Sequence, residues 1–168
     1  MYTYITKISA SELYSVKYPI SIIIADGTNM TISRDAELQA AITALLKIEE
    51  ATVLALQNIK KLETILVNGK FKVDLYVNAG VNSATNYKDY TMDFANNLSI
   101  AATTIVNATV TSMYIVSSQI DVFLKLNFSG NTSFTLPNNT WKVTSFTATT
   151  ITIQSRTNAA VTLVLKQI

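Results

Sequence analysis

One stretch of the sequence, residues 34–66, contains neither glycine nor proline over 33 consecutive positions. A helix of that length would extend for about 50 Å, which few helices of globular proteins reach. Ser33 is a good cap for its first turn, and two acidic residues follow. Asn68 and Gly69, which adopt left-handed conformations easily, come just after its last turn. The sequence therefore predicts one long helix over residues 34–66.

Apolar residues recur in this stretch at alternating spacings of three and four, which is the heptad pattern of a coiled coil. The residues at the two inward heptad positions are the candidate oligomerisation residues: Leu38, Ala41, Leu45, Ile48, Thr52, Ala55, Ile59, Leu62 and Leu66. Flanking positions such as Ile42 and Leu56 are also apolar, and a two-stranded coil would leave them in water. Thr52 is a polar residue of the kind that fixes register. The pattern favours a homotrimer.

Three further apolar residues, Leu46, Val53 and Leu54, fall at outward heptad positions, so the middle of the helix is apolar nearly all round. Something must therefore cover this part of the helix. We expect the N-terminal β module to fold back along it. The alternative is a single helix buried at the centre of a monomeric α+β domain.

The first 33 residues read as a small β module. Alternation at the start of the chain and a hairpin signal at Asp26 and Gly27 indicate short strands. So short a module cannot build a core of its own and should pack on a neighbour. Its tyrosines are candidates for an anchor interface, because tyrosine is enriched where proteins meet: Tyr2, Tyr4, Tyr14 and Tyr18.

From residue 70 to residue 168 the apolar pattern changes to a period of two, which is typical of half-buried strands. In the first strand, Phe71, Val73, Leu75 and Val77 are expected to share one face. Eight or nine short strands separated by turn residues predict a C-terminal antiparallel β-sandwich, with a jelly roll as one form of it. The expected fold is thus α+β and mainly β. Its domains are a module at 1–33, a coiled-coil helix at 34–66 and a β-sandwich head at 70–168.

The composition argues against an enzyme. The chain has no cysteine and no histidine, so it lacks the thiolate nucleophile, the commonest general base and the usual transition-metal ligands. Its four glycines are scattered, and no phosphate-binding loop is present. We predict no catalytic residues, no cofactor and no metal. A glycan-cleaving enzyme that uses carboxylates alone, such as Asp74 or Asp121, is the remaining catalytic alternative.

The charge is low, with 13 basic and 11 acidic residues and only two arginines, which argues against nucleic acid as a partner. No apolar run approaches the roughly 20 residues of a membrane helix, so we predict no membrane partner. Residues 1–4 show no basic patch or apolar stretch of a signal peptide. Trp141 follows a proline and two asparagines and is the best candidate for an exposed platform on which a sugar could stack. A core position for Trp141 is the alternative.

A small β anchor, a bundled helix and a Thr- and Asn-rich β head follow one another in this chain. This order resembles that of tailed-bacteriophage fibre and spike proteins, including the head fibres that project from capsids. The resemblance implies a non-enzymatic homotrimer, made in the bacterial cytoplasm, that docks on a capsid or tail protein through its N-terminus. It implies a place on the virion surface and a head that could contact a host glycan. The alternative is a compact capsid-decoration or lectin-like module with a buried central helix.

Overall fold

The structure of the chain, a computed structural model, describes residues 16–24, 27–104, 109–118, 120–128 and 138–168. The chain divides into two compact units, and the division falls between Ile48 and Glu49. This position lies within the long helix. The sequence placed its domain boundaries elsewhere, near residues 33 and 70.

The first unit contains an antiparallel hairpin of two strands, β1 (Ile20–Ile23) and β2 (Asn29–Ile32). The strands pair from Ile20 opposite Ile32 to Ile23 opposite Asn29. Gly27 adopts a φ of 87° in the turn, a conformation that glycine reaches without steric cost. The side chain of Ile32 is 2% exposed. The hairpin lies within the predicted β module, whose residues 1–15 and 25–26 are outside the described residues.

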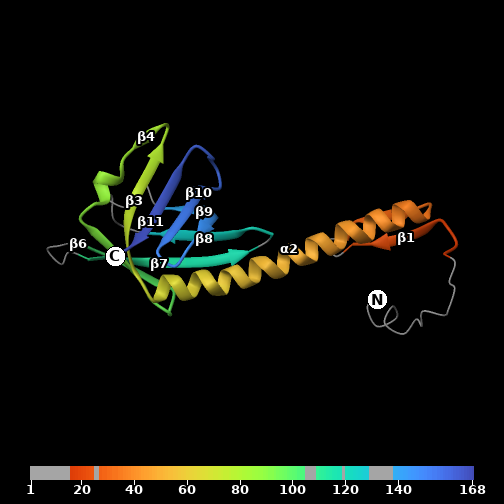
Figure 1. The fold of residues 1–168 in the computed structure, drawn as a ribbon, viewed down its shortest axis with the longest axis horizontal. Coiled ribbons are helices and arrows are strands. Elements are labelled where there is room, and N and C mark those ends of the chain that lie inside the picture. Colours follow the sequence, from red (N-terminus) through yellow and green to blue (C-terminus); the bar gives the residue numbers. More distant parts are fainter. Residues whose placement is uncertain (1–15, 25–26, 105–108, 119, 129–137) are drawn as a thin grey trace. The chain divides into compact units, whose positions relative to one another are not determined.

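Helix α2 (Asp35–Val67) begins and ends one residue later than the predicted helix (Figure 1). At its start, the main-chain N–H of Ser33 donates a 2.9 Å hydrogen bond to Oε2 of Glu37. At its end, the side-chain amide of Asn68 donates a 2.8 Å hydrogen bond to the carbonyl oxygen of Thr64. Carbonyls of the last turn have no partner within the helix, so this side chain satisfies one of them.

Gly69 follows the helix for a reason other than the predicted one. Its φ is not in the left-handed region, unlike that of Gly27 and Gly80. A Cβ atom on Gly69 would instead lie 2.7 Å from Nε2 of Gln167 and 3.1 Å from Cε2 of Phe71. Glycine is therefore present where the chain passes from the helix into a crowded part of the second unit.

Among its described residues, the second unit contains nine strands and a short 3-10 helix, η1 (Ala84–Tyr87). In chain order the strands are β3 (Lys70–Asn78), β4 (Val81–Asn82), β5 (Tyr90–Phe94), β6 (Ser99–Thr104), β7 (Thr109–Ser118), β8 (Val122–Asn127), β9 (Asn139–Phe146), β10 (Thr150–Ser155) and β11 (Thr162–Gln167). Each strand from β5 to β11 pairs antiparallel with the next. The predicted strand at residues 133–136 lies outside the described residues.

These strands form a closed barrel, and the predicted β-sandwich or jelly roll is wrong. Strand β11 pairs with β3 from Thr162 opposite Val77 to Gln167 opposite Phe71, and β3 also pairs with β5. Eight strands thus close on themselves, and β4 is an additional strand beside β3. A sandwich needs two separate sheets, whereas here one sheet returns to its own first strand. Closure removes the sheet edges that a sandwich keeps.

Two of these strands contain bulges. The bulge in β3 changes which side chains of that strand face inward. Val164 is opposite Leu75 and Leu165 is opposite Val73, so Asp74 is an extra residue in β3. Beyond this bulge Tyr76, which is 3% exposed, points into the core in place of the predicted Leu75 and Val77. A second register shift lies between Thr152 and Ile153, where β10 pairs with β9. Bulges increase bending and twist, which a closed barrel requires.

The barrel interior is filled by side chains. Phe94 packs edge to face on both Phe71 and Tyr114, with ring centroids 5.9 and 5.1 Å apart. Tyr76 makes similar contacts with Tyr87 at 5.9 Å and with Trp141 at 6.5 Å. Such edge-to-face pairs stabilise a core beyond the area that they bury.

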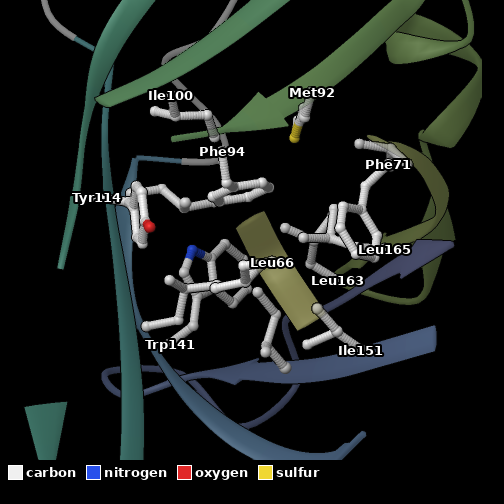
Figure 2. Close-up of a cluster of buried hydrophobic side chains, with 14 of the residues drawn as sticks. Leu66, Phe71, Met92, Phe94, Ile100, Tyr114, Trp141, Ile151, Leu163 and Leu165 are labelled. Carbon is white, nitrogen blue, oxygen red and sulfur yellow. The ribbon is translucent and has the colours of Figure 1, made fainter. Parts of the chain in front are cut away.

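Within the second unit, the last part of α2 covers one end of the barrel. Grooves beside the helix are lined by three neighbouring turns, through Leu98 after β5, Ile120 after β7 and Thr147 after β9. In an antiparallel meander these alternate turns lie at the same end. Leu66 of the helix lies among Phe94, Tyr114, Trp141, Ile151 and Leu163 (Figure 2). The other end carries the β3–β4 and β10–β11 connections.

Candidate self-association surface

The predicted heptad positions do not share one environment. Ala55, Leu62 and Leu66 are 3%, 0% and 0% exposed and belong to the core of the barrel, and Ile59 packs against that core. These side chains are in contact with their own chain. The earlier part of α2 is therefore the candidate self-association surface.

The earlier heptad positions are more open. Leu45 is 39% exposed and Ile48 is 50% exposed. Leu38, Ala41 and Thr52 are partly buried. The change from open to buried along the same heptad positions occurs between Thr52 and Ala55.

Between residues 42 and 56 the helix carries large apolar side chains that are 39–55% exposed, which we call the apolar belt. The belt consists of Ile42, Leu45, Leu46, Ile48, Val53, Leu54 and Leu56. Leu46, Val53 and Leu54 are the residues for which the sequence required a cover, and no described residue covers them fully. Contiguous exposed apolar surface of this kind marks a site of interaction in a protein that stays in solution.

The belt is wide as well as long. At about 100° per residue, the arc from Ile48 through Leu45, Leu56 and Ile42 to Leu46 covers about 160° of the helix surface. A two-stranded coiled coil uses a narrower seam. The exposed arc is thus wider than the seam of a two-stranded coil, and the homotrimer that the heptad pattern predicted stays a prediction.

A groove lies next to the belt residue Leu54, between α2 and the barrel. It has a volume of about 640 Å³, and Leu54 and Ile120 are among its lining residues. On the barrel side, Nζ of Lys142 donates a 2.8 Å hydrogen bond to Oδ2 of Asp121. The groove combines apolar and charged groups, and sequence reasoning gave no sign of it, because its two walls are far apart in the chain.

The predicted anchor residues are described only in part. Tyr2, Tyr4 and Tyr14 lie outside the described residues. Tyr18 is partly buried, and its hydroxyl donates a 2.6 Å hydrogen bond to Oδ1 of Asp35. This hydrogen bond raises the pKa of Tyr18 to about 12. Tyr18 thus contacts the first turn of α2, and its role as an anchor stays a prediction.

Trp141 does not form the predicted sugar platform. Its side chain is 0% exposed and packs inside the barrel against Tyr76. The alternation of strand β9 places Trp141 inward, which the neighbouring proline and asparagines did not indicate. The core alternative for Trp141 is confirmed.

Two acidic residues of the barrel, Asp121 and Asp93, form ion pairs with lysines. Asp121 pairs with Lys142, and Oδ2 of Asp93 lies 3.4 Å from Nζ of Lys70. In the part of the chain that the structure describes, no group of three acidic side chains is arranged to hold a metal ion. Among the same residues, no helix is both long enough and apolar enough to span a membrane.

No protein-family model, curated protein or solved structure that we compared with the chain shows a significant match. The functional proposal therefore depends on the chain's own residues and on the order of its segments.

Proposed function

We propose that the chain is a non-enzymatic structural protein that assembles as a trimeric fibre or spike through helix α2. The observation that supports the proposal is the apolar belt, which remains exposed on a helix whose last turns pack on the barrel of the same chain. A neighbouring copy offers an identical belt of matching length. Three copies then shield from water the surface that one copy leaves open.

The energy available from the belt sets the concentration at which assembly should occur. Burying the open half of one leucine, isoleucine or valine contributes about 1 kcal/mol. The seven belt residues together would contribute about 7 kcal/mol per copy, which is an upper estimate. A trimer that assembles at micromolar concentration requires about 16 kcal/mol per trimer, or about 5–6 kcal/mol per copy. We therefore expect assembly in the micromolar range.

The segment order supports a place in a virus particle. By resemblance to tailed-bacteriophage fibres, the N-terminal module docks on a capsid or tail protein, and the barrel is the displayed head. Three heads on one trimer make weak contacts with a host surface multivalent, and linked binding can raise avidity about a hundredfold. With Trp141 buried, any glycan contact has to come from other residues of the head.

Sedimentation equilibrium at several micromolar concentrations tests the assembly. The chain should sediment as a trimer, and the pair Leu45→Asp with Ile48→Asp should reduce it to a monomer, because charges would enter the belt. The matched control is Thr43→Asp with Gln57→Asp, which adds the same charge at exposed positions of the same helix outside the belt. A monomeric unmodified chain would overturn the proposal. Equal loss of assembly in both pairs would show that charge alone, and not the belt, is responsible.

The compact decoration or lectin-like module is the second candidate. The observation that favours it is the burial of Ala55, Leu62 and Leu66 against the barrel. Limited proteolysis separates the two functions. A fibre subunit studied below its assembly concentration should be cut in the early part of α2 and leave a stable fragment that starts near Glu49. A compact module with a buried central helix should resist cleavage along the whole of α2.

A further inference from the structure

Helix α2 carries two apolar rows that point in different directions. At about 3.6 residues per turn, residues that lie one above another on a helix recur at that interval. The residues that share one face of α2 at this interval form a set that we call the outer row. The set consists of Ile42, Leu45, Leu46, Glu49, Val53 and Leu56. Its five apolar members are all among the exposed large hydrophobic residues.

The second row is the one that packs on the barrel. Ala55, Leu62 and Leu66 lie within about 40° of one another on the helix surface and about 130° from the centre of the outer row. Residues repeating every 3.5 positions drift around a straight helix by about 20° per heptad. From Leu38 to Leu66 this drift carries the heptad positions from the edge of the outer row to the row that packs on the barrel.

We infer that the contact surface between copies is the outer row of α2, and that three copies meet there in parallel and in register. The inference rests on the proposed assembly and assigns the face that performs it. The partner is a second and a third copy of the same row. Closed assembly of three identical chains requires a threefold axis, and around such an axis all three helices run in the same direction.

Glu49 gives this arrangement its register. It lies close to the middle line of the outer row, with apolar residues one turn before it and one turn after it. In a parallel bundle in register, the three Glu49 carboxylates gather at one level, where they share the same water. A shift by one turn would place each carboxylate beside apolar side chains of the neighbours, which is costly. Polar residues inside coiled-coil seams fix register in this way and weaken association.

The outer row also has a defined end. The next residue on the same line after Leu56 is Lys60, followed by Glu63. Three Lys60 side chains at one level would repel one another, as the three Glu49 carboxylates also do at a cost in stability, and the apolar residues of the row end at Leu56, so the bundle should end there. From Ile42 to Leu56 the contact extends for about 21 Å.

Cysteine cross-linking tests the inference, because the chain has no cysteine of its own. A disulfide needs Cβ atoms about 3.5–4.5 Å apart. Ile42→Cys alone and Leu56→Cys alone should each give covalently linked pairs of chains under mild oxidation. Gln57→Cys, at an exposed position beside the row, and Leu62→Cys, buried in the barrel, are the matched controls and should remain unlinked.

Several outcomes would overturn it. Cross-linking only when Ile42→Cys and Leu56→Cys chains are mixed would show antiparallel helices. Absence of cross-linking at both positions in a chain that still sediments as a trimer would place the contact elsewhere and leave the proposed assembly intact. A monomeric chain would instead overturn the proposed function itself.

The role of Glu49 has its own measurement. Glu49→Leu should lower the concentration at half-assembly about tenfold, which is about a hundredfold in the trimer's dissociation constant and corresponds to about 2.7 kcal/mol per trimer. Glu50→Leu, which also removes a carboxylate but from a neighbouring line of the helix, is the control and should have a much smaller effect. Equal effects of the two substitutions would remove Glu49 from the interface.

Discussion

The ring of Tyr114 meets the ring of Phe94 edge to face, with centroids 5.1 Å apart and planes at 82°. The Tyr114 hydroxyl also donates a 3.1 Å hydrogen bond to the carbonyl oxygen of Ala95, in the turn after β5. One side chain thus joins the packed interior of the barrel to a turn at the end that α2 covers.

Removing only the hydroxyl isolates the second of these contacts. Tyr114→Phe should reduce the free energy of unfolding by about 1 kcal/mol, because a partly buried hydrogen bond is lost while the ring remains. Tyr114→Ala should reduce it by about 3–5 kcal/mol, since a buried aromatic ring is removed. Urea unfolding curves measure both values. Equal losses for the two substitutions would show that the hydroxyl and not the ring provides the stability.

The turn between β3 and β4 can be improved. Ala79 has a φ of 50° and Gly80 a φ of 79°, the left-handed conformations of a two-residue hairpin turn that favours Asn or Gly. Ala79→Gly should therefore stabilise the chain by about 0.5–1 kcal/mol. Ala148→Gly is the control, because Ala148 is exposed in another turn and has no left-handed φ. It should be neutral or destabilising in the same thermal unfolding experiment.

Alkaline pH should destabilise the barrel in a defined range. Burial, with a smaller contribution from Tyr76, raises the pKa of Tyr87 from 10.0 to about 12. The folded state therefore holds the phenolic proton more tightly than the unfolded state. Its contribution to stability is complete below pH 10 and is lost as the pH rises from 10 to about 12.

Urea unfolding at several pH values measures this loss. Tyr87→Phe should flatten the pH dependence in that range, because the titrating group is gone. Tyr90→Phe is a control on the neighbouring strand. An unchanged slope in Tyr87→Phe would assign the effect to another tyrosine.

Trp141 is the only tryptophan and therefore reports on the core without background. Because it is 0% exposed, its fluorescence should resist quenching by iodide until the chain unfolds. Trp141→Ala should cost about 3–5 kcal/mol. Strong quenching in the folded protein would place the indole at the surface and restore the sugar-platform prediction.

The sequence predicted the helix and the individual strands better than it predicted how the sheet closes into a barrel. The absence of glycine and proline gave α2 to within one residue at each end, because helix propensity and capping are local properties. An alternation of period two looks the same in a sandwich and in a barrel. The pairing of β11 with β3 and the extra residue at Asp74 make this sheet a barrel. Neither feature can be predicted from the residue pattern of a single strand.

The same limit applies to the candidate surface. An apolar row on a helix shows that something covers it, but not whether the cover is a neighbour or the same chain. Leu45 and Leu62 obey the same heptad, yet Leu45 is 39% exposed and Leu62 is 0% exposed. Tyr76 was likewise misplaced, because a bulge decides its orientation. Only contacts between distant segments resolve such cases.

Because the barrel is closed, two positions where a peptide or label could be added lie at its opposite ends. The main-chain N–H of Ile168 donates a 2.9 Å hydrogen bond to the carbonyl oxygen of Lys70, so residue 168 leaves the barrel at the end that the helix covers. A fluorescent label or an affinity tag fused after residue 168 would emerge beside α2. The exposed turn at Thr157 and Asn158, between β10 and β11, lies at the opposite end. A foreign peptide spliced into that turn would be presented at the end of the barrel opposite the helix.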